Sequence, residues 1–170
     1  MAQDIQLTNG VYEKKVVEVF DGVESQTLYV RALEALSDWA GSAKNSNINI
    51  DVQDKEEGIV VYKGKLYMGY RKVNVSGWNS YANFTLKIRC KEGKAQISTT
   101  IPSLTFVWAA KPSVRETIPM QSLVPYTHKT SAAVKKTAIE YTQKVPELFD
   151  TVIQYLIDKM KINREIEDDF

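Results

Sequence analysis

The sequence predicts an α+β domain in which helices cover one face of a five-stranded, mainly antiparallel sheet. Three observations lead to this prediction. Apolar and polar residues alternate in one early segment and in four later ones, which is the period of a half-buried strand. Apolar residues three to four apart, typical of an amphipathic helix, follow the first of these segments and return near the end of the chain. Short polar turns divide the later strands, as expected for hairpins between antiparallel neighbours.

The N-terminal part is predicted to form one strand and one helix. Residues 12–20 are rich in β-branched side chains, so we expect a strand there. Residues 25–40 follow a helical period, with Ser25 as the expected N-cap and Gly41 just after the end. The stripe that faces the core should consist of Leu28, Ala32, Leu36 and Trp39.

Four consecutive strands are expected next, at residues 48–53, 59–73, 84–91 and 95–101. In the second of these, the alternation places Tyr70 toward the core and Arg71 toward solvent, and residues 74–80 should form a hairpin loop. The third has the clearest period, with inward positions at Phe84, Leu86, Ile88 and Cys90. Pro102 cannot donate a ladder hydrogen bond, so it indicates an edge, a bulge or the end of a strand.

The C-terminal part should contain a long loop and a closing helix. Residues 111–129 hold three prolines and are expected to cross irregularly over the sheet, either as a simple connection or as a partner-binding segment. Thr130 or Ser131 should cap a helix that runs to about Ile162, and Pro146 should kink or split it. We therefore predict a flexible N-terminus at 1–11, one domain at 12–163 and an acidic tail at 164–170.

Composition argues against several classes of function. The chain has 170 residues, a net charge of +1, one cysteine and one histidine. One Cys and one His cannot form a typical zinc site, and no intramolecular disulfide is possible. The glycines form no phosphate-binding loop, and Glu56-Glu57 lie side by side in a predicted turn rather than facing each other. No apolar run is long enough to span a membrane. We expect a protein that is not an enzyme and needs no cofactor or metal.

Cations cluster in the middle of the chain. Eight Lys or Arg side chains lie between residues 63 and 94, with one acidic residue among them. Period-two alternation places most of them on the sheet face that no helix covers. The predicted binding surface consists of Lys63, Lys65, Tyr67, Arg71, Trp78, Lys87, Arg89 and Lys91. Such a surface suits nucleic acid, an acidic glycan or a phospholipid headgroup; a solvated face without a ligand is the alternative.

A second candidate site lies between the sheet and the closing helix. A long helix against a curved sheet can enclose an apolar pocket, although a filled core is the simpler expectation. Its lining would be Tyr62, Met68, Tyr70, Phe106 and Trp108.

Several short segments carry a family resemblance. Residues 12–19 read YEKKVVEV, residues 28–33 read LYVRAL ahead of Trp39, and DKEEG at 54–58 precedes a strand that contains Gly64. Over residues 12–108 the chain resembles an uncharacterised bacterial family, a domain of unknown function with a TATA-binding-protein-like fold, found mostly in anaerobic gut bacteria. The resemblance implies the same element order, and it supplies no catalytic residue that could be carried over to this chain.

The resemblance also bears on location. Members of that family usually carry an export signal, whereas residues 1–5 lack the basic and apolar parts of one. We expect a periplasmic or secreted protein whose signal has been removed; a cytoplasmic protein is the alternative. The resulting hypothesis is a non-enzymatic binding domain of the bacterial cell envelope that is monomeric or weakly dimeric. Its partner would be a protein or an acidic polymer, and an apolar-ligand carrier is the second possibility.

Overall fold

The computed structural model describes residues 5–44 and 46–162. The elements in chain order are β1 (Tyr12–Val19), α1 (Ser25–Ser42), β2 (Asn47–Asp54), β3 (Ile59–Val73), β4 (Ser76–Lys91), β5 (Lys94–Trp108), β6 (Arg115–Pro119), α2 (Met120–Leu123) and α3 (Ala132–Lys161). No helix in these two described stretches is long and apolar enough to cross a membrane. The predictions for residues 1–4 and 164–170 fall outside the described residues. Within the N-terminal segment that was predicted to be flexible, Thr8 and Val11 pair through an isolated antiparallel bridge.

The strands form one antiparallel sheet in the order β1-β5-β4-β3-β2, with β6 also paired to β5. The α+β class is therefore confirmed, but the predicted count of five strands is wrong. The sixth strand, β6, and the short helix α2 lie inside residues 111–129, which were expected to be irregular. β6 gives a weak sequence signal because it is short, and only Ile118 among its side chains is buried. Its one proline and its polar residues therefore resemble a loop.

Pro102 lies at the place where β5 changes partner. On one edge, β5 pairs with β1 up to Ile101 and with β6 from Ser103 onward. On the other edge, the register with β4 shifts at this point, so that β5 has one extra residue: Ile101 and Pro102 lie opposite Phe84 alone. Of the three expectations for Pro102, the bulge is correct: a residue without an N–H group occupies a position where the ladder is interrupted.

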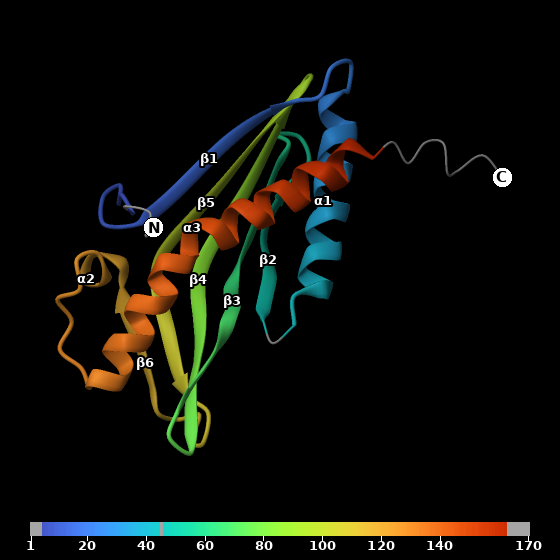
Figure 1. Ribbon diagram of the computed structural model, residues 1–170. Helices are drawn as coiled ribbons and strands as arrows, with labels where there is room; N and C mark the ends of the chain where they lie inside the picture. Colours follow the sequence, from blue (N-terminus) through green and yellow to red (C-terminus); the bar gives the residue numbers. More distant parts are fainter. Residues whose placement is uncertain (1–4, 45, 163–170) are drawn as a thin grey trace.

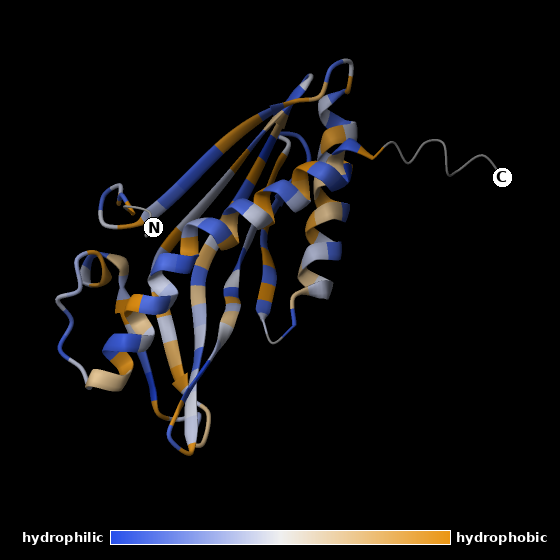
Figure 2. Cartoon of the chain, in the orientation of Figure 1, coloured by the Kyte–Doolittle hydropathy of each residue, from blue (hydrophilic) through white to orange (hydrophobic). Residues whose placement is uncertain are grey.

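Helices α1 and α3 both lie on one face of the sheet and contact each other there (Figure 1). Orange apolar and blue polar residues alternate along the strands and along α3 (Figure 2), as expected where only one side is buried. The predicted stripe of α1 is confirmed, since each of its four side chains is at most 6% exposed. The inward positions predicted for β4 are also buried, including Cys90. These side chains fill the space between sheet and helices.

A bulge at Met68 reverses the faces of β3. Tyr67 pairs with Tyr81, but Gly69 pairs with Ser80, so β3 contains one extra residue. Because side chains alternate with a period of two, every later residue of β3 changes face. The predictions for Tyr70 and Arg71 are therefore both wrong. Tyr70 is 46% exposed on the open side, and Arg71 lies on the helix side.

The turn between β3 and β4 is shorter than predicted. Val73 pairs with Ser76, so Asn74 and Val75 alone connect the strands. Asn74 has a φ of 56°, a left-handed conformation that Asn tolerates better than most residues. Gly77 belongs to β4, where a Cβ atom would lie 2.2 Å from the carbonyl oxygen of Arg71. Gly77 therefore allows β3 and β4 to approach closely. Because glycine is also typical of turns, the sequence predicts a loop at residues 74–80 instead of a strand.

The helix ends differ in how they are capped. The expected cap by Ser131 is confirmed, since its Oγ accepts a hydrogen bond from Val134 N at 3.4 Å. Ser25 is not a cap: α1 starts there, and Ser25 N donates to Glu92 Oε1 of the β4–β5 turn at 3.1 Å. Pro146 lies inside α3, which continues through it as one helix while the ribbon changes direction along its length (Figure 1).

Candidate functional site

The open face of the sheet carries a row of cations because β4 alternates strictly. Leu86, Ile88 and Cys90 are buried against the helices, so the residues between and after them must point the other way. Those residues are Lys87, Arg89 and Lys91, all exposed. The face also carries Lys63 and Lys65 of β3 and Lys94 of β5; we call the set Lys63, Lys65, Lys87, Arg89, Lys91 and Lys94 the basic face.

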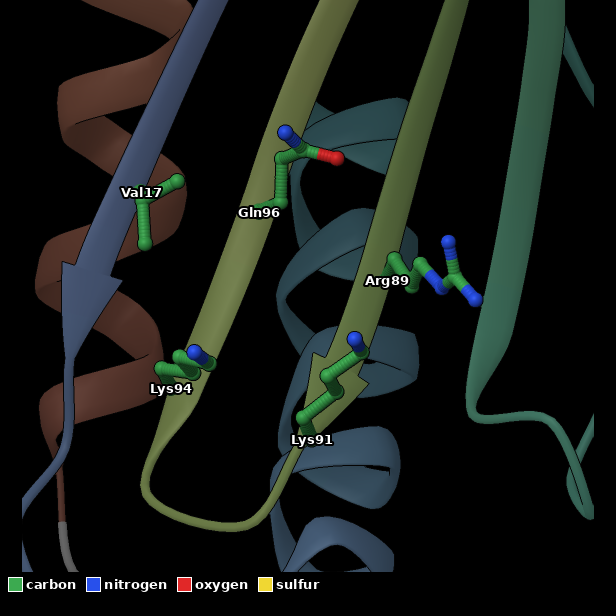
Figure 3. Close-up of a pocket in the computed structure, with 5 residues that line it drawn as sticks. All are labelled: Val17, Arg89, Lys91, Lys94 and Gln96. Carbon is green, nitrogen blue, oxygen red and sulfur yellow. The ribbon is translucent and has the colours of Figure 1, made fainter.

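The densest part of the basic face surrounds a cavity of about 180 Å³. Its lining consists of Val17, Arg89, Lys91, Lys94 and Gln96, and we call it the basic pocket. Figure 3 shows these five side chains on the near side of the strands, with both long helices behind. Strand register brings them together: Gln96 pairs with Val17 on one side and with Arg89 on the other, and Lys91 pairs with Lys94.

The cations in and beside the basic pocket differ from Lys63 in their ion pairing. Lys63, farther along the face, forms an ion pair with Asp51 at 3.0 Å. By contrast, Lys87, Arg89, Lys91 and Lys94 form no ion pair within the part of the chain that the structure describes. Like charges directly opposite each other in a sheet are destabilising, and Lys91 and Lys94 form such a pair. An anion in the pocket would relieve this repulsion.

Six of the eight predicted site residues lie on the open face, and two do not. Arg71, turned over by the β3 bulge, binds α3: its Nε lies 3.1 Å from Glu140 Oε2, and its Nη1 donates to Thr137 Oγ1 at 3.4 Å. Trp78 is 8% exposed and packs against Trp108, with ring centroids 5.0 Å apart. Both are structural residues.

Three members of the basic pocket were missing from the predicted site. Lys94 and Gln96 are outward residues of β5, and Val17 belongs to β1. The two-residue turn Glu92-Gly93 places Lys91 opposite Lys94, so hairpin geometry would have added Lys94. Nothing in the sequence indicated that β1 lies beside β5, which depends on the order of strands in the sheet.

Tyr67 lies on the open face but is held in place by its neighbours. Its hydroxyl donates to Asn79 Oδ1 at 3.1 Å, and its ring lies 5.4 Å from that of Tyr81 at an angle of 58°. Burial raises the pKa of Tyr67, and the nearby hydroxyls of Tyr81 and Tyr70 add to the shift, so the side chain is neutral at physiological pH. The Tyr67 ring is therefore packed against its neighbours and is not a free surface on which a base could stack.

The remaining reactive side chains have structural surroundings. Desolvation by burial raises the pKa of Cys90 to about 12, which keeps this thiol protonated and unreactive. His128 Nε2 bonds Glu116 Oε1, and Thr130 Oγ1 donates to Glu116 Oε2 at 2.9 Å, which ties the segment before α3 to β6. Within residues 5–44 and 46–162, no group of three His, Cys, Asp or Glu side chains could hold a metal ion.

The second predicted site, between sheet and closing helix, is occupied by core side chains. Phe84 lies 5.5 Å from Trp39 and 5.9 Å from Phe149 between ring centroids, and Phe106 is fully buried. Tyr70 is on the opposite face, so the five proposed lining residues do not converge. A cavity of about 290 Å³ does lie beside α3, lined by Met68, Lys144, Glu147, Leu148 and Thr151.

Comparisons with known proteins agree with this architecture. The structure superimposes on a DUF4468 family protein from Bacteroides ovatus with a TM-score of 0.69 and 12% sequence identity, covering 94% of this chain and 91% of the other. It superimposes on a TBP-like protein from Parabacteroides distasonis with a TM-score of 0.61 and 11% identity, covering 91% and 97%. No curated protein matches. The sequence profile of one family matches residues 14–104, more than half of the chain. The chain belongs to this family, described as a domain of unknown function (DUF4468) with TBP-like fold.

Proposed function

We propose that the domain is a non-enzymatic binding module that takes an acidic polymer on its basic face. The observation that carries this proposal is a group of four cations: Arg89, Lys91 and Lys94 line the basic pocket, and Lys87 precedes them on the same face of β4. Among the described residues, none of the four forms an ion pair. The net charge of the chain is only +1, so the positive potential is a local property of this face. A concentrated patch attracts a polyanion even when the whole molecule is close to neutral.

The compartment we propose is the cell envelope. Proteins of the family that the sequence resembles usually carry an export signal, which would place the domain outside the cytoplasm. A polymer with many anionic groups is the kind of partner that a surface of this charge would bind. The partner would contact several cations at once, because neighbouring outward residues of β4 are about 7 Å apart along the strand.

The alternative, a carrier of a small apolar ligand, has weaker support. The interior is filled by rings such as those of Phe84 and Phe149. The cavity beside α3 has two apolar lining residues, Met68 and Leu148, and three polar ones. A binding site for an apolar molecule is usually lined mainly by apolar side chains.

The proposal is tested by measuring binding of inorganic polyphosphate at several salt concentrations. Affinity should fall steeply as salt rises, because binding releases condensed counterions. Lys87→Ala should reduce the slope of log affinity against log salt concentration by about 1. Lys136→Ala is the matched control: Lys136 is exposed on α3, away from the basic face, and its loss should leave the slope unchanged.

Two results would overturn the proposal. One is polyphosphate affinity that is absent or independent of salt. The other is an equal loss of slope for Lys87→Ala and Lys136→Ala, because the anion would then respond to total charge and not to this face. Binding of an apolar fluorescent probe that Met68→Ser abolishes, without polyphosphate binding, would favour the carrier.

A further inference from the structure

A second hollow lies on the same open face, next to the basic pocket. It has a volume of about 410 Å³ and is formed by strands β2, β3, β4 and β5. Most of its side chains are neutral hydrogen-bonding groups or paired charges. We call it the amide groove; its polar lining consists of Asn47, Asn49, Asp51, Lys63, Lys65, Asn83 and Thr85.

The amides of the groove are held in position by hydrogen bonds. Asn49 Nδ2 donates to Asn47 Oδ1 at 3.0 Å. Asn83 Nδ2 donates to Ser103 Oγ and to Thr105 Oγ1, each at 2.9 Å. These bonds leave the Oδ1 atoms of Asn49 and Asn83 as acceptors and Nδ2 of Asn47 as a donor. The groove thus offers donors and acceptors whose orientation is set before a ligand arrives.

Lys87 connects the amide groove to the basic pocket. On β4 it lies two residues from Thr85, which lines the groove, and two residues from Arg89, which lines the pocket. Thr85 and Arg89, one from each hollow, are therefore about 13 Å apart along the strand and lie on one face. A single extended molecule can contact both.

We propose that the acidic polymer is a polysaccharide that carries carboxylate groups. This inference rests on the proposed function and names the chemistry of its ligand. Sugar hydroxyls donate and accept hydrogen bonds, which matches a groove lined by amides that are themselves held by hydrogen bonds. Asp51, ion-paired with Lys63 at 3.0 Å, can accept hydrogen bonds from sugar hydroxyls, which carry no charge. The sugar carboxylates pair with Lys87 and Arg89, where a guanidinium can bind both oxygens.

Nucleic acid fits this surface less well. Binding of single strands relies on aromatic rings whose faces are open for base stacking. Tyr67 and Tyr81 pack against each other, and the Tyr67 hydroxyl is bonded to Asn79.

The test compares four probes on the full chain by titration calorimetry at one ionic strength. They are oligogalacturonate, its neutral methyl ester, inorganic polyphosphate and oligo-dT. Oligogalacturonate should bind at least tenfold more tightly than its methyl ester. Asn49→Ala and Thr85→Val should each weaken oligogalacturonate about fivefold, the effect of one lost hydrogen bond, and leave polyphosphate affinity unchanged.

Gln53→Ala is the matched control, because Gln53 is also exposed on β2 but does not line the groove; both affinities should stay the same. Melting temperatures of all variants establish that each is folded. The inference is overturned if Asn49→Ala weakens both polyanions equally or neither, or if oligo-dT binds more tightly than oligogalacturonate. If polyphosphate binds and oligogalacturonate does not, this inference fails while the basic face stands. If neither binds, the proposed function fails as well.

Discussion

Lys91 and Lys94 are directly opposite each other across the β4–β5 hairpin, joined by a turn of only two residues. Two cations in this position repel each other, and both also line the basic pocket with Arg89. The sheet is therefore less stable here than it could be. The same arrangement concentrates positive charge at one place, where an anion would be attracted.

Replacing one of these lysines should separate stability from binding. Lys94→Glu converts the repulsive pair into an attractive one, so we expect the free energy of unfolding to rise by about 0.2–1 kcal/mol. Polyphosphate affinity should fall in the same variant. Urea denaturation and calorimetry measure the two quantities. A variant that is both less stable and unchanged in binding would contradict this account of the hairpin.

Arg71 should behave as a structural residue. Its ion pair with Glu140 is partly exposed, with side chains 31% and 44% accessible, so Arg71→Ala should cost about 1 kcal/mol or less. Because Arg71 lies on the helix side of the sheet, polyphosphate affinity should change little. Lys87→Ala provides the comparison: it should lower affinity and leave stability nearly unchanged. The reverse pattern would mean that the β3 bulge does not turn Arg71 over.

Gly64 permits close packing of β2 against β3. A Cβ atom there would lie 2.0 Å from the carbonyl oxygen of Asn47, which is backbone and cannot move aside cheaply. Gly64→Ala should destabilise the protein by about 1–3 kcal/mol, and it should loosen β2 and the amide groove. Gly41→Ala is the control: nothing lies within 4 Å of its Cβ position in α1, so stability should rise slightly. Thermal unfolding of both variants tests this contrast.

Cys90 should make stability fall at alkaline pH. Burial raises the pKa of its thiol from 9.0 to about 12, so the folded state holds a proton that the unfolded state releases. Between about pH 9 and 12 the unfolded chain binds fewer protons, and the free energy of unfolding therefore decreases as pH rises. Below pH 9 this contribution is constant.

The difference between wild type and Cys90→Ala isolates this effect, because burial also raises the pKa of tyrosines such as Tyr141, which contribute to alkaline titration in both proteins. The stability difference between the two proteins should shrink as pH rises above 9. A difference that stays constant up to pH 11 would contradict a buried, protonated thiol. Native-state alkylation of Cys90 at pH 8 should also be slow compared with alkylation in urea.

Period-two and helical patterns predicted most of the fold. The stripe of α1 and the inward face of β4 were predictable because each element keeps one face buried along its whole length. The faces of residues after a bulge could not be predicted. One extra residue at Met68 leaves the sequence pattern intact but moves Arg71 to the other face of the sheet. The basic pocket was predicted only in part, because Val17 reaches it through the pairing of β1 with β5. Strand order in the sheet has no signature in local periodicity.

The central claim, that the basic face binds polyanions, is tested most directly by mapping backbone amide shifts while polyphosphate is added. The account predicts that the largest shifts fall between Lys87 and Gln96, on the β4–β5 hairpin and its outward neighbours. Shifts should be small on α3, on the far side of the sheet. Shifts that concentrate on α3 or around Met68, or that spread evenly over the surface, would contradict it.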